Sequence, residues 1–192
     1  MAFRTPSFAR ISCTPVIVAI ALSSTATVPV RAGETPAPAF PRVRTDAPSI
    51  KALLQQGAAR SATFRDLLVA IDRTDGIIWI EEGQCLHSVD ACLVLSVRVV
   101  GPNRLLRVMI NPNRNERAVI ASIGHELRHA IEVLSELSIR SNADLYQFYD
   151  REGRTNSGRF ETEAAVRAGL DVWTELGRKG VTKRKGVTKD EE

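Results

Sequence analysis

Two histidines frame a glutamate in the segment His125-Glu126-Leu127-Arg128-His129, and only three histidines occur in the chain. If this segment is helical, the two imidazoles lie one turn apart on one face, with the carboxylate beside them. Neutral imidazoles are preferred ligands of zinc, and a neighbouring carboxylate takes a proton from water at such an ion. The spacing therefore predicts a zinc site with His125 and His129 as ligands and Glu126 as the general base.

The residues around this motif predict the helix that it needs. Asn113 follows a strand-breaking proline and is placed to cap a helix from about residue 114 to residue 136, with Glu116 three residues after the cap. Apolar residues recur at helical spacing along one stripe, which comprises Val119, Ile120, Ile123, Leu127, Ile131, Leu134 and Leu137. The face that carries the histidines has small residues that leave space for a cleft, namely Ala118, Ala121 and Ser122.

The rest of the pattern predicts an α+β fold. Strand-like runs precede the motif helix at residues 77–81, 91–100 and 105–110, and a hairpin-type turn joins the last two. Helices are expected at residues 49–56, 61–73, 143–149 and 160–176, with a polar loop at 153–158. Ser61 is placed to cap the second of these helices, and Trp79 and Trp173 are expected in the core. We therefore predict a small, mainly antiparallel sheet packed on the motif helix.

The first 32 residues have the layout of a secretory signal. Arg4 and Arg10 precede an apolar run at residues 16–22, and residues 30–32 fit the small-x-small pattern of a cleavage site. The apolar run is too short to span a bilayer as a helix. We expect a secreted or periplasmic protein with no stable membrane anchor after cleavage; the alternative is a buried N-terminal helix.

One domain is expected between two unstructured segments. Residues 33–48 are rich in proline, which predicts an extended linker, and residues 49–177 carry the predicted helices and strands. Residues 178–192 are basic, repeat the unit Lys-Gly-Val-Thr-Lys and lack apolar periodicity, so a disordered tail is expected. Although the net charge is +4, residues 33–177 carry seventeen basic and nineteen acidic side chains, so nucleic acid is not an expected partner.

Cys85 and Cys92 are the only cysteines that remain once residues 1–32 are removed. In an exported protein, two cysteines close in sequence favour a disulfide. The competing interpretation is a metal clip made of both thiols and His87. The spacing does not fit a zinc knuckle and export favours oxidation, so we predict the disulfide.

Two segments carry a resemblance to a known family. Residues 124–130 (Gly-His-Glu-Leu-Arg-His-Ala) and residues 160–165 (Phe-Glu-Thr-Glu-Ala-Ala) resemble the paired motifs of zincin-like metallopeptidases of the gluzincin type, and of small exported bacterial proteins that share them. The resemblance covers residues 105–176. It implies a minimal zincin-like domain, a Zn²⁺ cofactor and hydrolysis of peptide bonds.

The same resemblance implies where the third zinc ligand lies. Gluzincin-type peptidases take it from a glutamate on a downstream helix, commonly followed three residues later by a small residue. Glu161 matches this pattern with Ala164, so the C-terminal helix is expected to supply the ligand. Glu163 is the alternative, although it projects to the other side, near Arg167. A third interpretation is that both glutamates are first-turn carboxylates favoured by the helix dipole.

Three further residues receive subsidiary roles. Metzincins require glycine and histidine where this chain has Glu132 and Ser135, which excludes that class. Glu132 lies about 10 Å along the helix axis from His125, so we expect it to support a ligand or form a structural salt bridge rather than bind the ion. Tyr146 and Tyr149 are candidate donors to a developing oxyanion, as in other zinc peptidases, with packing in the core as the alternative.

The predicted function is that of an exported zinc metallopeptidase. Water activated by zinc and Glu126 would attack a peptide carbonyl of a peptide or protein substrate. The strand at residues 105–110 is expected to be the edge strand that holds the substrate by backbone pairing. The main alternative is a non-catalytic secreted protein that keeps the zinc for stability or for binding a partner.

Overall fold

The computed structural model of the 192-residue chain describes residues 40–85, 89–152, 154–156 and 159–178. The predicted signal segment, His87 and residues 179–192 of the predicted tail lie outside the described residues. None of the described helices is long and apolar enough to cross a membrane.

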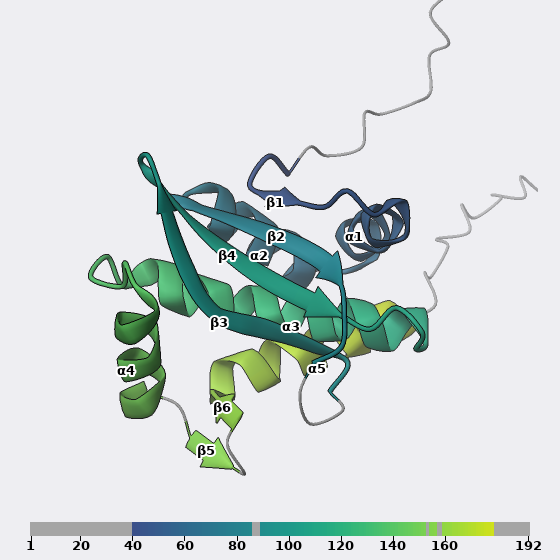
Figure 1. Cartoon of the computed structure of the whole chain (residues 1–192). Helices are drawn as coiled ribbons and strands as arrows, with labels where there is room; N and C mark the ends of the chain where they lie inside the picture. The colour runs from purple at the N-terminus through teal and green to yellow at the C-terminus, as the bar shows by residue number, and fades with distance from the viewer. Residues whose placement is uncertain (1–39, 86–88, 153, 157–158, 179–192) are drawn as a thin grey trace, which may run out of the picture. The chain divides into compact units, whose positions relative to one another are not determined.

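The described residues form an α+β fold, as predicted, and Figure 1 shows its arrangement. The helices are α1 (Pro48–Arg60), α2 (Ala62–Asp72), α3 (Glu116–Ser135), α4 (Asn142–Glu152) and α5 (Glu163–Gly177). The strands are β1 (Val43–Arg44), β2 (Gly76–Glu82), β3 (Ala91–Val100), β4 (Asn103–Ile110), β5 (Arg154–Asn156) and β6 (Arg159–Glu161). Strands β1 to β4 make one sheet, and β5 and β6 pair separately.

The four-stranded sheet is mixed, in the order β1-β2-β4-β3. The prediction of a mainly antiparallel sheet is wrong, because β1 with β2 and β2 with β4 pair in parallel and only β3 with β4 is antiparallel. After β2 the chain passes the position of β4, forms β3 at the edge, and returns through a turn in which Gly101 has a φ of 57°. This path inserts β4 between β2 and β3.

The edge strand beside the motif helix is therefore β3. The prediction that residues 105–110 form this edge is wrong, since β4 has a partner on both sides. Along β3 the register with β4 shifts between Leu93 and Val97, which leaves a bulge at residues 94–96. Strand β1 lies within the segment that was expected to be a linker, where Val43 pairs with Ile78.

The sheet buries one face against α2 and α3, which lie behind it in Figure 1. Side chains alternate along β2 and β4, and the apolar ones that are fully buried are Ile78, Ile80, Leu106, Val108 and Ile110. The predicted stripe of α3 enters this core, although Ile131 is only partly buried and Leu137 lies beyond the helix and is exposed.

The core predictions for Trp79 and Trp173 are wrong. Trp79 is partly exposed because its side chain alternates with the buried side chains of β2 and so lies on the other face of the strand. Trp173 lies on an exposed face of α5.

Helix α1 extends beyond the predicted residues 49–56 at both ends. Pro48 suits the first turn because its φ is fixed and its missing N–H has no partner there. The helix continues through Gly57, where a Cβ would lie 2.9 Å from side-chain atoms of both Ile120 and Phe64. Glycine lowers helix propensity but lets α1 approach α2 and α3 closely.

Two other helices begin later than predicted. Asn115, not Asn113, caps α3, because its Oδ1 accepts a hydrogen bond from the amide of Arg117 at 3.0 Å. Helix α5 begins at Glu163 rather than at residue 160, because Thr162 is the cap and has an extended backbone. The preceding residues, expected to be a polar loop and the start of the helix, include the β5–β6 pair.

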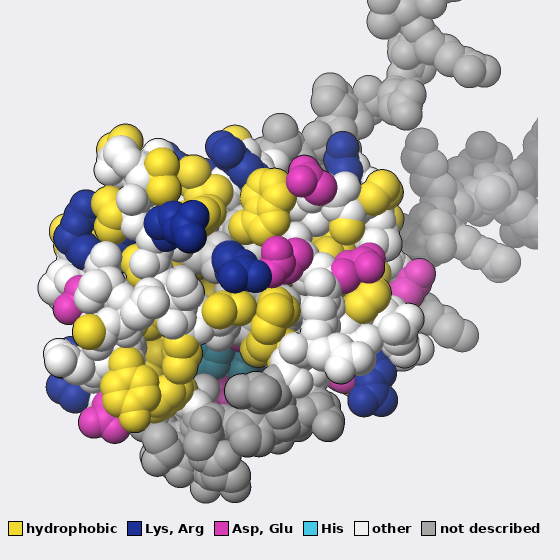
Figure 2. Space-filling view, viewed as in Figure 1, with side chains coloured by type: hydrophobic (Ala, Val, Ile, Leu, Met, Phe, Trp, Pro, Cys, Tyr) yellow, Lys and Arg dark blue, Asp and Glu magenta, His cyan; other side chains and the backbone are white. Residues whose placement is uncertain are grey.

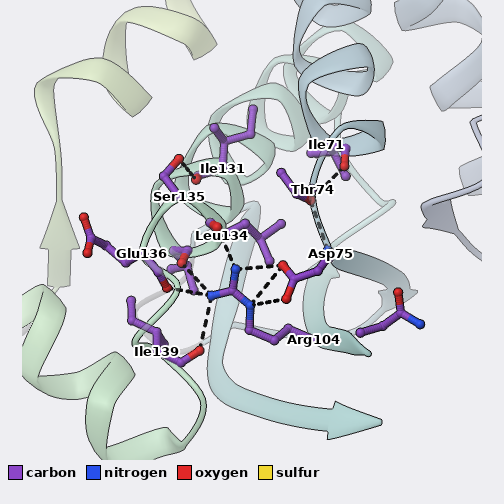
Figure 3. Close-up of polar contacts among 12 residues, drawn as sticks. Ile71, Thr74, Asp75, Arg104, Ile131, Leu134, Ser135, Glu136 and Ile139 are labelled. Carbon is purple, nitrogen blue, oxygen red and sulfur yellow. Dashed lines mark hydrogen bonds and ion pairs between the residues drawn. The ribbon is translucent and has the colours of Figure 1, made fainter. Parts of the chain in front are cut away.

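A buried arginine joins β4 to the end of α3, as Figure 3 shows. Arg104 pairs with Asp75 at 2.7 Å and is fully buried. Its guanidinium also donates hydrogen bonds to the backbone carbonyls of Val133, Leu134, Glu136 and Ile139. One side chain thus bonds carbonyls of the last turn of α3 and of the segment that follows it.

Candidate metal centre

Side-chain nitrogens of two histidines of α3 and a carboxylate oxygen of the last residue of β6 lie within 4.8 Å of one another. Nε2 of His125 lies 3.2 Å, and Nε2 of His129 lies 3.4 Å, from Oε1 of Glu161. Ligand atoms about 2.0–2.1 Å from a tetrahedral zinc ion lie about 3.3 Å from one another. The two measured separations match this value, and the three residues form a group that could hold a metal ion.

Glu161 reaches the group from a different element than predicted. It is the last residue of β6 and precedes the cap of α5, so the expectation that the C-terminal helix supplies it is wrong. Glu163, the alternative ligand, lies in the first turn of α5 and pairs with Arg167 at 3.2 Å. Its side chain is 83% exposed and is not part of the group. Of the two glutamates, the structure brings only Glu161 to the histidines.

The second ring nitrogen of His129 is also held in place. Nδ1 of His129 lies 3.1 Å from Oε2 of Glu132. The other oxygen of Glu132 accepts a hydrogen bond from Oγ1 of Thr162 at 2.9 Å. These bonds orient the ring of His129 so that its Nε2 atom faces Glu161.

Close packing of α3 against α5 completes the position of the histidines. A Cβ on Gly169 would lie 3.3 Å from Cβ of His125, and one on Gly124 would lie 2.9 Å from the side chain of Val172. Both glycines therefore permit an approach that a larger residue would obstruct. This approach brings the start of α5, and with it Glu161, to the motif.

Glu126 lies beside the group and is almost completely buried. Its Oε2 accepts a hydrogen bond from the backbone amide of Leu93 at 2.6 Å, and its Oε1 lies 3.9 Å from Nε2 of His125. Burial raises the pKa of Glu126 to about 7, although His129 and the Leu93 amide lower it in part. The carboxylate is thus anchored through one oxygen while the other faces the metal position.

The residues of the candidate metal group shift one another's pKa values. Burial lowers the pKa of His129, but its hydrogen bonds with Glu132 and Glu161 have the larger combined effect and raise this pKa to about 9. Burial and the neighbouring His129 lower the pKa of His125. Burial raises the pKa of Glu161, but its hydrogen bond with His129 and the charges of both histidines lower it overall. The group therefore holds one proton on His129 near neutral pH, in the place where a divalent cation would supply positive charge.

The group lies on the floor of a cleft of about 970 Å³ between β3 and α5. Small residues of α3 leave this space as predicted, since Ala118, Ala121 and Ser122 line it. Tyr149 also lines the cleft, but its hydroxyl donates to the backbone carbonyl of His129 at 3.4 Å and its ring stacks on Phe160. Tyr146 is exposed and does not line the cleft, so it has no access to an oxyanion there.

The disulfide between Cys85 and Cys92 is present, as predicted, with the Cα atoms 6.0 Å apart. Cys92 lines the cleft next to Leu93, whose amide holds Glu126. The bridge therefore ties the start of β3 to the segment that follows β2. It braces the wall of the cleft beside the candidate base.

Two parts of the site were missed by the sequence analysis. The amide of Leu93 carries no signal of its own, because every residue except proline has one. Thr162 does carry a signal, since a threonine before a run of helix-forming residues is a typical cap. Applied to residues 162–165, that rule would have placed Glu161 outside the helix.

Comparisons of the chain with models of known protein families, with curated proteins and with solved structures found no match. Function is therefore inferred from the geometry and chemistry of the site.

Proposed function

We propose that this protein is an exported zinc-dependent metallopeptidase that hydrolyses peptide bonds. The observation that carries the proposal is the convergence of His125, His129 and Glu161 on one point, with Glu126 beside them, at the floor of an open cleft. The disulfide is compatible with an oxidising compartment, and the layout of residues 1–32 supports export.

Zinc is the metal that the donor set favours. Two imidazole nitrogens and one carboxylate oxygen are typical ligands of catalytic zinc, and their spacing suits a tetrahedral ion. Calcium and magnesium prefer sets made of oxygen atoms alone. Within the described residues the group offers three candidate ligands, and a catalytic zinc site keeps its fourth position for water or substrate. That count favours the enzyme over a closed structural site.

When bound, zinc lowers the pKa of water and polarises a peptide carbonyl. Glu126 accepts the proton of the attacking water at Oε1, which faces the metal position. The amide of Leu93 holds Oε2 and so fixes the direction of the carboxylate. Glu126 then donates this proton to the amine that leaves. Burial, which raises the pKa of Glu126, favours acceptance of a proton by this carboxylate.

Peptidase activity can be tested with unfolded casein and with a variant that keeps the ligands. The wild-type protein loaded with zinc should release peptides, and Glu126→Gln should abolish release while the zinc content stays near one ion per chain. Loss of zinc in Glu126→Gln would show that the carboxylate is a ligand rather than the base. A wild-type protein that binds zinc and cleaves no polypeptide would favour the non-catalytic alternative.

The identity of the third ligand has a matched control two residues away. Glu161→Gln should weaken zinc binding strongly, because it removes one of the three ligands. Glu163→Gln changes an exposed glutamate that pairs with Arg167, and it should leave zinc affinity unchanged. Equal zinc affinities in the two variants would refute the assignment of Glu161.

A further inference from the structure

We propose that the substrates are polypeptides with a large apolar side chain next to the bond that is cleaved, and that an apolar face of α5 selects them. This face consists of Val166, Leu170 and Trp173 and is called the α5 face below. The inference rests on the proposed peptidase function and specifies its substrate class.

The α5 face has the spacing and the exposure of a binding surface. Its members are three and four residues apart, so they lie on one side of the helix, while α5 packs into the core through Ala165, Ala168, Val172 and Leu176. Leu170 is 60% exposed and Trp173 is 40% exposed, and both line the cleft that holds the metal group. Leu95, in the bulge of β3, is another exposed apolar residue of the same cleft. Figure 2 shows apolar side chains around the hollow in which histidine is visible.

Trp173 is held rigidly enough to serve as an anchor for a substrate side chain. The guanidinium of Arg117 lies 4.0 Å from the centre of its ring, and Nε of Arg117 donates to its backbone carbonyl at 2.7 Å. A preformed aromatic surface loses little conformational freedom when a ligand binds. The ring therefore presents apolar area that does not need to be ordered first.

The charges of the cleft favour an uncharged side chain. Arg114 is the only lysine or arginine among the described lining residues, and it is paired with Asp90 at 3.0 Å. Of the remaining acidic groups, Glu161 belongs to the metal group and Glu126 lies beside it. An acidic substrate residue would find no free cation among these residues, and a basic residue would lose water beside apolar walls.

Backbone pairing along the edge of β3 is restricted, which leaves selection to side chains. The amide of Leu93 donates to Glu126 at 2.6 Å, and the amide of Val97 donates to Asn142 at 2.9 Å. The acceptors are side chains of α3 and α4, which lie outside the sheet. Because side chains of the protein already occupy these donors, regular strand addition between the two positions would have to displace them.

The test uses two peptides and a pair of leucine variants. The peptides are identical except for their central pair, which is Leu-Leu in one and Gln-Gln in the other. For the wild type, kcat/KM should be about 10- to 200-fold higher for Leu-Leu. Leu170→Gln should reduce this preference about tenfold, because it removes the most exposed apolar contact. Leu137→Gln alters a leucine that is 74% exposed and does not line the cleft, so it should keep the wild-type preference.

Binding to an inactive variant separates this inference from the proposed function. Zinc-loaded Glu126→Gln should bind the Leu-Leu peptide more tightly than the Gln-Gln peptide in calorimetry. If this preference is found and the wild type cleaves neither peptide, the apolar site stands and the peptidase function falls. If both peptides are cleaved and bound equally, or if Leu137→Gln and Leu170→Gln lose the preference alike, the α5 face does not select substrates.

Discussion

Replacing Arg104 with methionine should destabilise the protein severely without touching the metal group. The substitution keeps an unbranched apolar stem but removes the guanidinium that pairs with Asp75 and holds the end of α3. Removing one partner of a buried ion pair costs about 3–5 kcal/mol. Because Asp75 is partly solvated, loss of its ion pair should cost an amount at the lower end of this range, about 3 kcal/mol.

The carbonyls at the end of α3 add to this loss. Four of them accept hydrogen bonds from Arg104. Water can reach the exposed turn at Glu136 more readily than the buried residues Val133 and Leu134, so the carbonyls together should contribute about 1 kcal/mol. The expected total is about 4 kcal/mol, a large part of the roughly 5–15 kcal/mol by which a domain is stable. For a domain of this size it corresponds to a fall in Tm of roughly 12 °C.

Urea unfolding with the disulfide intact would measure the effect, with Arg107→Met as the matched control. Arg107 lies three residues further along β4 and pairs with Glu81 at the surface, so its loss should cost less than about 1 kcal/mol. The slope m should be the same in both variants, because neither substitution changes the surface exposed on unfolding. If Arg104→Met and Arg107→Met were equally stable, the buried cluster would not hold α3 to β4 as inferred.

The same pair predicts a dependence on pH. The hydrogen bond and charge of Arg104 lower the pKa of Asp75 in the folded protein. Stability from this shift is therefore complete above the unfolded pKa of about 3.9 and is lost as the pH falls below it toward the lower folded value. The wild type should show this loss in acid unfolding curves, and Arg104→Met should lack it.

The remaining predictions concern the metal group. Zinc must displace the proton of His129, because the pKa of this residue is raised to about 9. Zinc affinity, measured in competition titrations, should therefore rise about tenfold per pH unit from pH 7 to 9 and level off above that. A zinc affinity that does not change with pH would contradict this protonation state. In the metal-free protein the raised pKa of His129 adds stability that is complete below about pH 6.5 and is lost as the pH rises through 9. Thr162→Val should lower zinc affinity about 10- to 100-fold through loss of its bond to Glu132, and Thr162→Ser should restore it. Ser61→Ala, which removes the cap of α2 instead, should change the Tm but not the zinc affinity.

Local patterns in the sequence predicted the elements whose causes are local. The apolar stripe of α3, the small residues opposite it and the cap Ser61 all act within a few turns of helix, and the structure contains each of them. The bridge between Cys85 and Cys92 spans only seven positions, and these two are the cysteines of the part of the chain that the structure describes. These features can be derived because few competing arrangements satisfy them.

Long-range arrangements were not predictable in the same way. Whether β4 pairs with β2 or lies at the edge depends on how the chain crosses after β2, and the alternation of side chains is the same in both cases. Arg104 occupies a buried position of β4, where the pattern calls for an apolar residue, and only its partners from α3 and Asp75 make it stable there.

Glu161 shows how a residue can be identified while its structural setting is not. It was expected on a helix, yet a ligand on the first turn of α5 would point as Glu163 does, toward Arg167 and solvent. Thr162 keeps Glu161 out of the helix, because it follows β6, caps α5 and donates a hydrogen bond to Glu132. Glu132, which lies thirty positions earlier in the chain than Thr162, in turn holds the ring of His129. The threonine next to the candidate ligand is thus bonded to the carboxylate that orients another ligand, so loss of this bond should disturb both sides of the metal position at once.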